Sequence, residues 1–191
     1  MITLREIVYG IYGAYRLCRF DPQGTVYLDD TVAGFWRSFF SAVLIVPPTL
    51  ILTLIEWRNA AIAGSIAHAI ILEALAYVIL VFAYPLAAFY LCRMMGRGER
   101  YILFIVASNW SSVIQIALLL PVTALGASEL LPADLFFFIS LAADVLIFAM
   151  AWYIARTTLQ IGGVAAAGMV LVDLAIVILV RNVTDGRLVV A

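Results

Sequence analysis

Several residue types that soluble proteins use freely are scarce in this chain. Its 191 residues include no lysine, one histidine and two cysteines, and only 12% are charged, which is about half the share in soluble globular domains. The net charge of −1 provides no positive field that would attract nucleic acid. A single histidine excludes a His-rich metal site, and Cys18 and Cys92 form no C-x-x-C pair. We therefore expect no metal site, no cofactor and no nucleic-acid partner.

Apolar side chains are abundant instead, at 66% of the residues. A soluble domain of this length cannot hide so much apolar surface, because small domains bury a limited fraction of their chain. The apolar stretches are each long enough to cross a hydrocarbon core of about 30 Å as a helix. The sequence thus predicts an all-α integral membrane bundle of five transmembrane helices in a lipid bilayer. The expected spans are about residues 31–55, 69–92, 101–120, 135–155 and 161–180.

Residues 1–30 predict an amphipathic interfacial helix on the cytoplasmic side rather than a signal peptide. Thr3 and Glu6 have the spacing of a capping box at its start, and residues 21–24 (Asp-Pro-Gln-Gly) fit a type I turn at its end. Apolar residues recur at helical spacing on one side. Arginine and tyrosine recur on the other, so the helix can lie among lipid headgroups. The alternative is that it packs on the loops of the protein itself. The residues expected at the membrane interface, including two at the start of the first span, are Arg5, Arg16, Arg19, Trp36 and Arg37.

The distribution of arginine predicts the orientation. An odd number of spans, filling residues 31–181, places the two ends of the chain on opposite sides. Eight arginines fall on the N-terminal side, and the other three are Arg58, Arg181 and Arg187. Because cytoplasmic loops carry the excess of positive charge, we expect a cytoplasmic N-terminus in a bacterial inner membrane. Residues 182–191 would then form a short periplasmic tail, in which Asp185-Gly186 suggests a tight hairpin.

Two adjacent prolines, Pro47 and Pro48, lie in the middle of the first span. Each removes a backbone donor, so we expect this helix to kink or to break there. A kink is the simpler outcome. A broken helix would expose carbonyl groups to a ligand, as in some transporters.

Three acids lie at membrane depth: Glu73, Asp144 and Asp173. No arginine shares their apolar runs, and a charged aspartate near the centre of a span costs roughly 2.5–3.5 kcal/mol on insertion scales. Small residues recur on the same helical faces, which favours an inward position against other helices. Asn109 and Gln115 make the third span the most polar. These five residues form the predicted intramembrane polar site.

Three functions are compatible with such a site. The sequence favours the first, a structural, adaptor or accessory protein without catalytic activity, in which neutral acids fix helix register and a membrane-protein partner or a second copy binds. Alternatively, the acids would carry protons or cations through a small transporter or channel. An intramembrane enzyme comes third: two aspartates on adjacent helices resemble a protease dyad, but the Tyr-Asp and Gly-x-Gly-Asp motifs of those families are absent.

Two N-terminal stretches carry a family resemblance. Residues 12–22 (YGAYRLCRFDP) and 34–39 (GFWRSF) resemble the N-terminal part of uncharacterised bacterial multi-pass membrane proteins. The plan of five spans after a cytoplasmic segment is also similar to that of Yip1-type membrane proteins. This resemblance implies a role in trafficking or an unknown role rather than catalysis, and it assigns no functional residue.

Overall fold

The computed structural model describes residues 2–57, 65–128 and 130–188, and these residues form helices without any β-strand. Predicted residues outside this part, such as Arg58, are not described. The α-helices are α1 (Leu4–Cys18), α2 (Val32–Ser38), α3 (Phe40–Trp57), α4 (Ile66–Met94), α5 (Tyr101–Ala127), α6 (Ala133–Leu159) and α7 (Gly163–Leu188). Two short 3-10 helices, η1 (Pro22–Tyr27) and η2 (Gly98–Arg100), lie in the connections.

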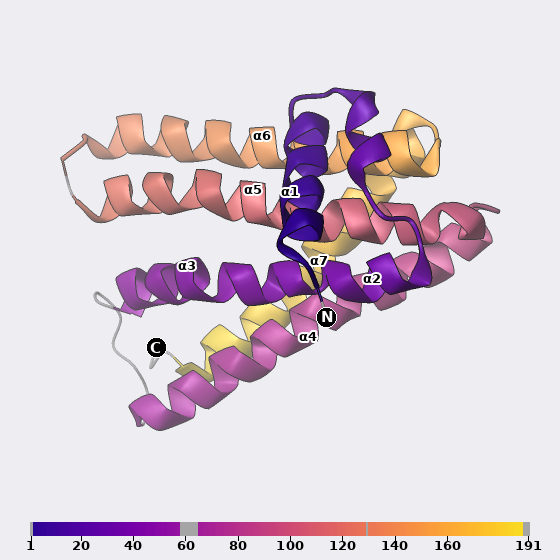
Figure 1. Cartoon of the computed structure of the whole chain (residues 1–191). Helices are drawn as coiled ribbons and strands as arrows, with labels where there is room; N and C mark the ends of the chain where they lie inside the picture. Colours follow the sequence, from indigo (N-terminus) through magenta and orange to yellow (C-terminus); the bar gives the residue numbers. More distant parts are fainter. Residues whose placement is uncertain (1, 58–64, 129, 189–191) are drawn as a thin grey trace.

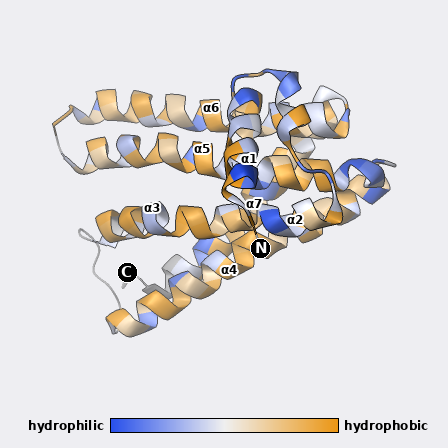
Figure 2. Ribbon diagram, in the orientation of Figure 1, coloured by the Kyte–Doolittle hydropathy of each residue, from blue (hydrophilic) through white to orange (hydrophobic). Residues whose placement is uncertain are grey.

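Five segments of the described chain are long and apolar enough to cross a membrane, which confirms the predicted fold class. The ribbons of α3, α4 and α6 are mostly apolar (Figure 2). Many of their large apolar side chains are exposed; Phe82 and Phe138, for example, are 52% and 65% exposed. A soluble protein does not leave so much contiguous apolar surface in water. The five segments are Val32–Ile55, Ile66–Met94, Gly98–Ala127, Ala133–Leu159 and Gly163–Thr184.

Two predicted helix interruptions differ from the structure, one at Pro47-Pro48 and one at Pro121. The first span is interrupted at Phe39, between α2 and α3, whereas Pro47 and Pro48 lie inside an uninterrupted α3. A break at the prolines was therefore wrong. α5 continues through Pro121 to Ala127, since membrane helices tolerate proline where neighbouring groups compensate for its missing donor.

The C-terminal hairpin was also wrong. α7 continues through Asp185 and Gly186 to Leu188, so most of the expected tail is helical. Once a helix has formed, each added residue contributes a further backbone hydrogen bond without a new nucleation cost. A turn signal of two residues is too weak to end it.

The helices form two layers (Figure 1). In one layer α5 packs between α3 and α6, and in the other α4 packs along α7. The layers are joined where α4 leads into α5 and where α6 leads into α7. Away from these connections α4 and α7 diverge from α5 and α6, and the backbones of α3 and α4 are not closely packed. A cavity lined by residues of α3 to α7 lies between the two layers.

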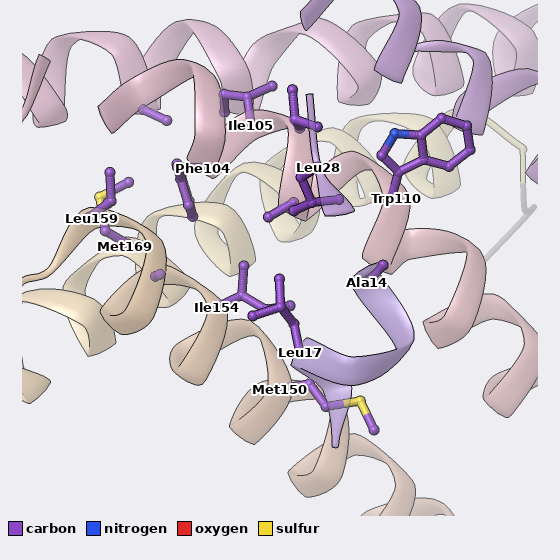
Figure 3. Close-up of a cluster of buried hydrophobic side chains, with 14 of the residues drawn as sticks. Ala14, Leu17, Leu28, Phe104, Ile105, Trp110, Met150, Ile154, Leu159 and Met169 are labelled. Atoms are coloured by element: carbon purple, nitrogen blue, oxygen red, sulfur yellow. The ribbon is translucent and has the colours of Figure 1, made fainter. Parts of the chain in front are cut away.

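The main apolar cluster lies where α1 crosses α5 and α6 (Figure 3). Ala14 and Leu17 of α1 are fully buried in a cluster with Trp110 of α5 and Ile154 of α6. Complete burial of a leucine side chain contributes about 2 kcal/mol. Gly10 lies directly against the Trp110 ring, where a Cβ atom would overlap it. The N-terminal segment is thus part of the folded bundle.

Candidate functional site

A cavity of about 360 Å³ lies between the two layers and is lined by all five span helices from α3 to α7. Hydrogen-bonding side chains of α3 and α5 line one wall: Ser41, Thr49, Ser108, Asn109, Ser112 and Gln115. The opposite layer adds Tyr77, Asp173 and Arg181. The remaining lining is largely aliphatic and aromatic. The site is a polar pocket inside an otherwise apolar bundle.

Several of these polar groups are fixed by neighbours. The Nδ2 group of Asn109 donates to Ser38 Oγ at 2.8 Å, which ties α5 to α2. The Ser112 hydroxyl donates to the Asn109 carbonyl at 2.6 Å. The Tyr77 hydroxyl donates to the Ala42 carbonyl and links α4 to α3. These bonds hold the cavity wall in place and leave part of its polar surface free.

Asp173 is the acid of the cavity. It lies on the same face of α7 as Ala166 and Met169, both buried, and reaches the pocket two turns beyond Ala166. Within the described residues no ion pair or side-chain hydrogen bond involves Asp173. No described buried side-chain oxygen lacks a partner, so the carboxylate oxygens of Asp173 are reached from the cavity. An accessible carboxylate without a cation is a site for a positively charged group.

Glu73 and Arg181 form an ion pair at the edge of the cavity. Arg181 Nη1 lies 3.2 Å from Glu73 Oε2 and 3.3 Å from Oε1, joining α7 to α4. Arg181 lines the polar cavity, whereas Glu73 lines a second cavity beside it. The negative charge of Glu73 on α4 is therefore compensated by an arginine of another span helix, α7.

Asp144 does not line the polar cavity. It is exposed on α6, and it lies outside the lining of the cavity. Asp144 shares a helical face with Ile147 and Ala151, which line the cavity, but it lies one turn beyond them. Of the five residues predicted to share one polar site, Asn109, Gln115 and Asp173 come together, Glu73 borders them through Arg181, and Asp144 is apart from them.

Tyr77 and Arg181 were not predicted as site residues. Arg181 was counted only as a flanking charge, although the cavity-lining residues of α7 recur at helical spacing. These residues are Val170, Asp173, Val177 and Arg181. A search for polar residues on the face of Asp173 would have found Arg181. Tyr77 follows Glu73 by one helical turn and would have been found in the same way.

The five predicted interfacial residues fall into two groups. Arg16 donates to Asp21 at 2.7 Å and to Gln23 at 2.9 Å, and Arg37 pairs with Glu6 at 3.0 Å and with Asp29. These two arginines fasten the N-terminal segment to itself and to α2. The group that faces outward consists of Arg5, Arg19 and Trp36.

The acids of these ion pairs have lowered pKa values. The hydrogen bond from Arg16, followed by that from the Gln23 backbone, lowers the pKa of Asp21. The Thr3 backbone N–H lowers the pKa of Glu6. Burial alone would raise the pKa of Asp29, but hydrogen bonds from Thr31 and Arg37 outweigh it and lower the pKa. All three carboxylates are held in the charged form.

Five span helices around an intramembrane polar cavity define the class: this is a multi-pass α-helical membrane protein. No protein-family model, curated protein or solved structure matches the chain. In the described residues no three His, Cys, Asp or Glu side chains are grouped so as to hold a metal ion. The cavity offers hydrogen-bonding side chains, the carboxyl group of Asp173 and the guanidinium group of Arg181, which is paired with Glu73.

Proposed function

We propose that this protein is a non-enzymatic, proton- or cation-coupled transporter in which Asp173 binds the cation. The observation that carries the proposal is the accessible carboxylate of Asp173 in the cavity, without an ion-pair partner in the described chain. A charged aspartate at this depth is unfavourable by roughly 2.5–3.5 kcal/mol unless it gains a partner. A bound cation or proton supplies that partner.

The surroundings of Asp173 suit a small ligand. The cavity volume of about 360 Å³ falls in the range of small-molecule sites, about 300–1,000 Å³. Gln115 and Ser108 on the opposite wall provide acceptors and donors that orient it. The backbones of α3 and α4 are not closely packed, which leaves room for the relative movement of the two layers that alternating access requires.

The proposal includes the setting predicted from the sequence. We place the protein in a bacterial inner membrane with a cytoplasmic N-terminus and a periplasmic C-terminus, supported by the arginine count. The resemblance to uncharacterised bacterial membrane proteins and to the five-span Yip1 plan belongs to the same proposal.

A second candidate function is that of an accessory protein that binds another membrane helix, either of a partner or of a second copy. The observation that favours it is Asp144, which is exposed at the middle of α6. Lipid is a poor environment for a carboxylate, whereas a neighbouring helix can supply a hydrogen bond.

The test uses the full chain in proteoliposomes with an imposed pH gradient, probed with Na⁺ and with methylammonium. We expect the wild-type protein to dissipate the gradient when one of these cations is added, and Asp173→Asn to abolish the response. Asp144→Asn is the matched control, since it removes an acid of the same depth outside the cavity, and it retains the response. No response in the wild type, or full activity of Asp173→Asn, would overturn the proposal.

A further inference from the structure

We infer that the ligand of the cavity is an amphiphile drawn from the bilayer, namely a lipid whose head carries an amine and whose alkyl tail occupies the apolar space between α3 and α4. The inference rests on the proposed function, because the amine would be the cation that Asp173 binds. Beyond that function, the inference assigns the ligand an alkyl tail, assigns the tail to a second cavity, and gives the ligand a path from the bilayer.

The second compartment is a cavity of about 480 Å³ next to the polar one. It is formed by the C-terminal half of α3, the N-terminal half of α4 and Arg181 of α7. Most of its lining side chains are apolar, and the charged exceptions, Glu73 and Arg181, are paired with each other. Leu50, Leu54, Ile66 and Ile70 are among its lining residues. An apolar space of this kind suits an alkyl chain, because burial of each CH₂ group contributes about 0.8 kcal/mol.

The two cavities share their walls. Thr49, Tyr77, Leu80 and Arg181 line both of them. A single molecule can therefore place its polar end beside Asp173 and its apolar end between α3 and α4. The methylene groups of Arg181 can border the tail while its guanidinium stays paired with Glu73.

A third cavity opens between α3 and α4 toward the lipid side. It has a volume of about 480 Å³, and Val43, Val46, Pro47 and Val78 contribute to its lining. One end is bounded by the rings of Phe39 and Phe82, which stack with their centroids 5.4 Å apart. Since the backbones of α3 and α4 are not closely packed, this opening provides a lateral path for a lipid tail.

Charge favours an amine-bearing head over an anionic one. The cavity contains one accessible carboxylate, Asp173, whereas its only lining arginine, Arg181, is already paired with Glu73 within the described structure. A head with a net negative charge would meet the uncompensated charge of Asp173, whereas a zwitterionic head such as that of phosphatidylethanolamine can turn its ammonium group toward Asp173. A protonated amine gains the attraction of the Asp173 carboxylate and can donate hydrogen bonds to neighbouring acceptors such as the amide oxygen of Gln115.

The first test measures binding of dodecylammonium and butylammonium to the full chain in nanodiscs made of phosphatidylglycerol. We expect dodecylammonium to bind at least tenfold more tightly, and Asp173→Asn to lose both ligands. Ala74→Phe, which places a ring in the apolar compartment, should lose the advantage of the long chain and keep butylammonium binding. Ala142→Phe on the exposed side of α6 is the matched control and should bind like the wild type.

The outcomes separate the inference from the function on which it rests. Equal affinities for the long and short ammonium ions would overturn the amphiphile and leave cation binding intact. Binding of neither ion would overturn both. A second measurement identifies the source: native mass spectrometry of protein released from nanodiscs that contain phosphatidylethanolamine. We expect a retained phosphatidylethanolamine on the wild type and none on Asp173→Asn; a wild type that binds dodecylammonium but retains no lipid would overturn the bilayer as the source.

Discussion

Glu73 of α4 and Arg181 of α7 are 108 residues apart in sequence and form an ion pair at 3.2 Å. The pair joins the two helices of one layer at the border between the polar and the apolar cavity. It also explains how an acid is accommodated in the longest apolar helix of the described chain. The pair fixes α7 against α4 at the end where both helices leave α5 and α6.

Removing one member of this pair should destabilise the protein. We expect Arg181→Gln to lower stability by about 1–3 kcal/mol, since Glu73 would then be left without its charged partner. The change is measured as a lower Tm in detergent. The double variant Glu73→Gln/Arg181→Gln is the control and should recover much of the loss, because it leaves no uncompensated charge. A double variant that is less stable than the single one would contradict this explanation.

The predictable part of the fold is the part encoded by local sequence. Apolar stretches of about 20 residues predict spans directly, and the capping box of Thr3 and Glu6 is confirmed at the start of α1. The convergence of Asn109, Gln115 and Asp173 also followed from helical spacing and depth. Each of these conclusions needs only the residues of one helix and its position in a bilayer.

The features that the sequence did not predict depend on how the helices diverge from one another. The inward position of Asp144 was inferred from small residues on its face. In the structure α7 leaves α6 for α4 beyond their connection (Figure 1), and Asp144, one turn beyond the cavity-lining part of its face, is exposed. The pairing of Glu73 with Arg181 results from the same divergence. Likewise, no local pattern places Gly10 against Trp110, one hundred residues away.

Gly10 offers a test of how α1 is held on α5. An added Cβ would overlap the Trp110 ring, so Gly10→Ala should detach α1. Cys18 is buried at the end of this helix, and burial raises the pKa of its thiol, which keeps it unreactive. We expect maleimide labelling of Cys18 to become at least tenfold faster in Gly10→Ala.

Two controls accompany this measurement. Cys92 is buried on α4, which is not closely packed against α1, and should keep its labelling rate in the same sample. Gly168→Ala introduces the same methyl group at a position on α7 with nothing within 4 Å, and should change neither rate. Unchanged labelling of Cys18 in Gly10→Ala would mean that the helix accommodates the methyl group without detaching.

Acid should loosen the N-terminal segment. Glu6, Asp21 and Asp29 have lowered pKa values in the folded protein. Such groups stabilise the folded state above their ordinary pKa, and the contribution is lost as the pH falls through the lowered value. We therefore expect hydrogen-exchange protection of α1 to be constant near neutral pH and to fall below about pH 4.

Single variants show which acid causes the loss of hydrogen-exchange protection at low pH. Asp21→Asn removes the main partner of Arg16, so it should reduce protection of residues 16–27 already at neutral pH and show a smaller further loss in acid. Asp30→Asn is the matched control, because Asp30 is exposed and makes no ion pair within the described chain. Equal pH profiles for wild type and Asp21→Asn would show that another group controls the transition.

The two intramembrane aspartates should respond in opposite ways to replacement by leucine. Asp144 is exposed on α6 and lies outside the cavity, so Asp144→Leu exchanges an unfavourable carboxylate for an apolar side chain. It should raise the Tm in nanodiscs, recovering part of the roughly 2.5–3.5 kcal/mol that a charged aspartate costs in lipid. Asp173→Leu should instead abolish ammonium binding, since the leucine fills the polar cavity with a group that binds no cation. If Asp144→Leu lowers the Tm and dissociates an oligomer, the exposed carboxylate meets another helix, and the accessory function becomes the better explanation.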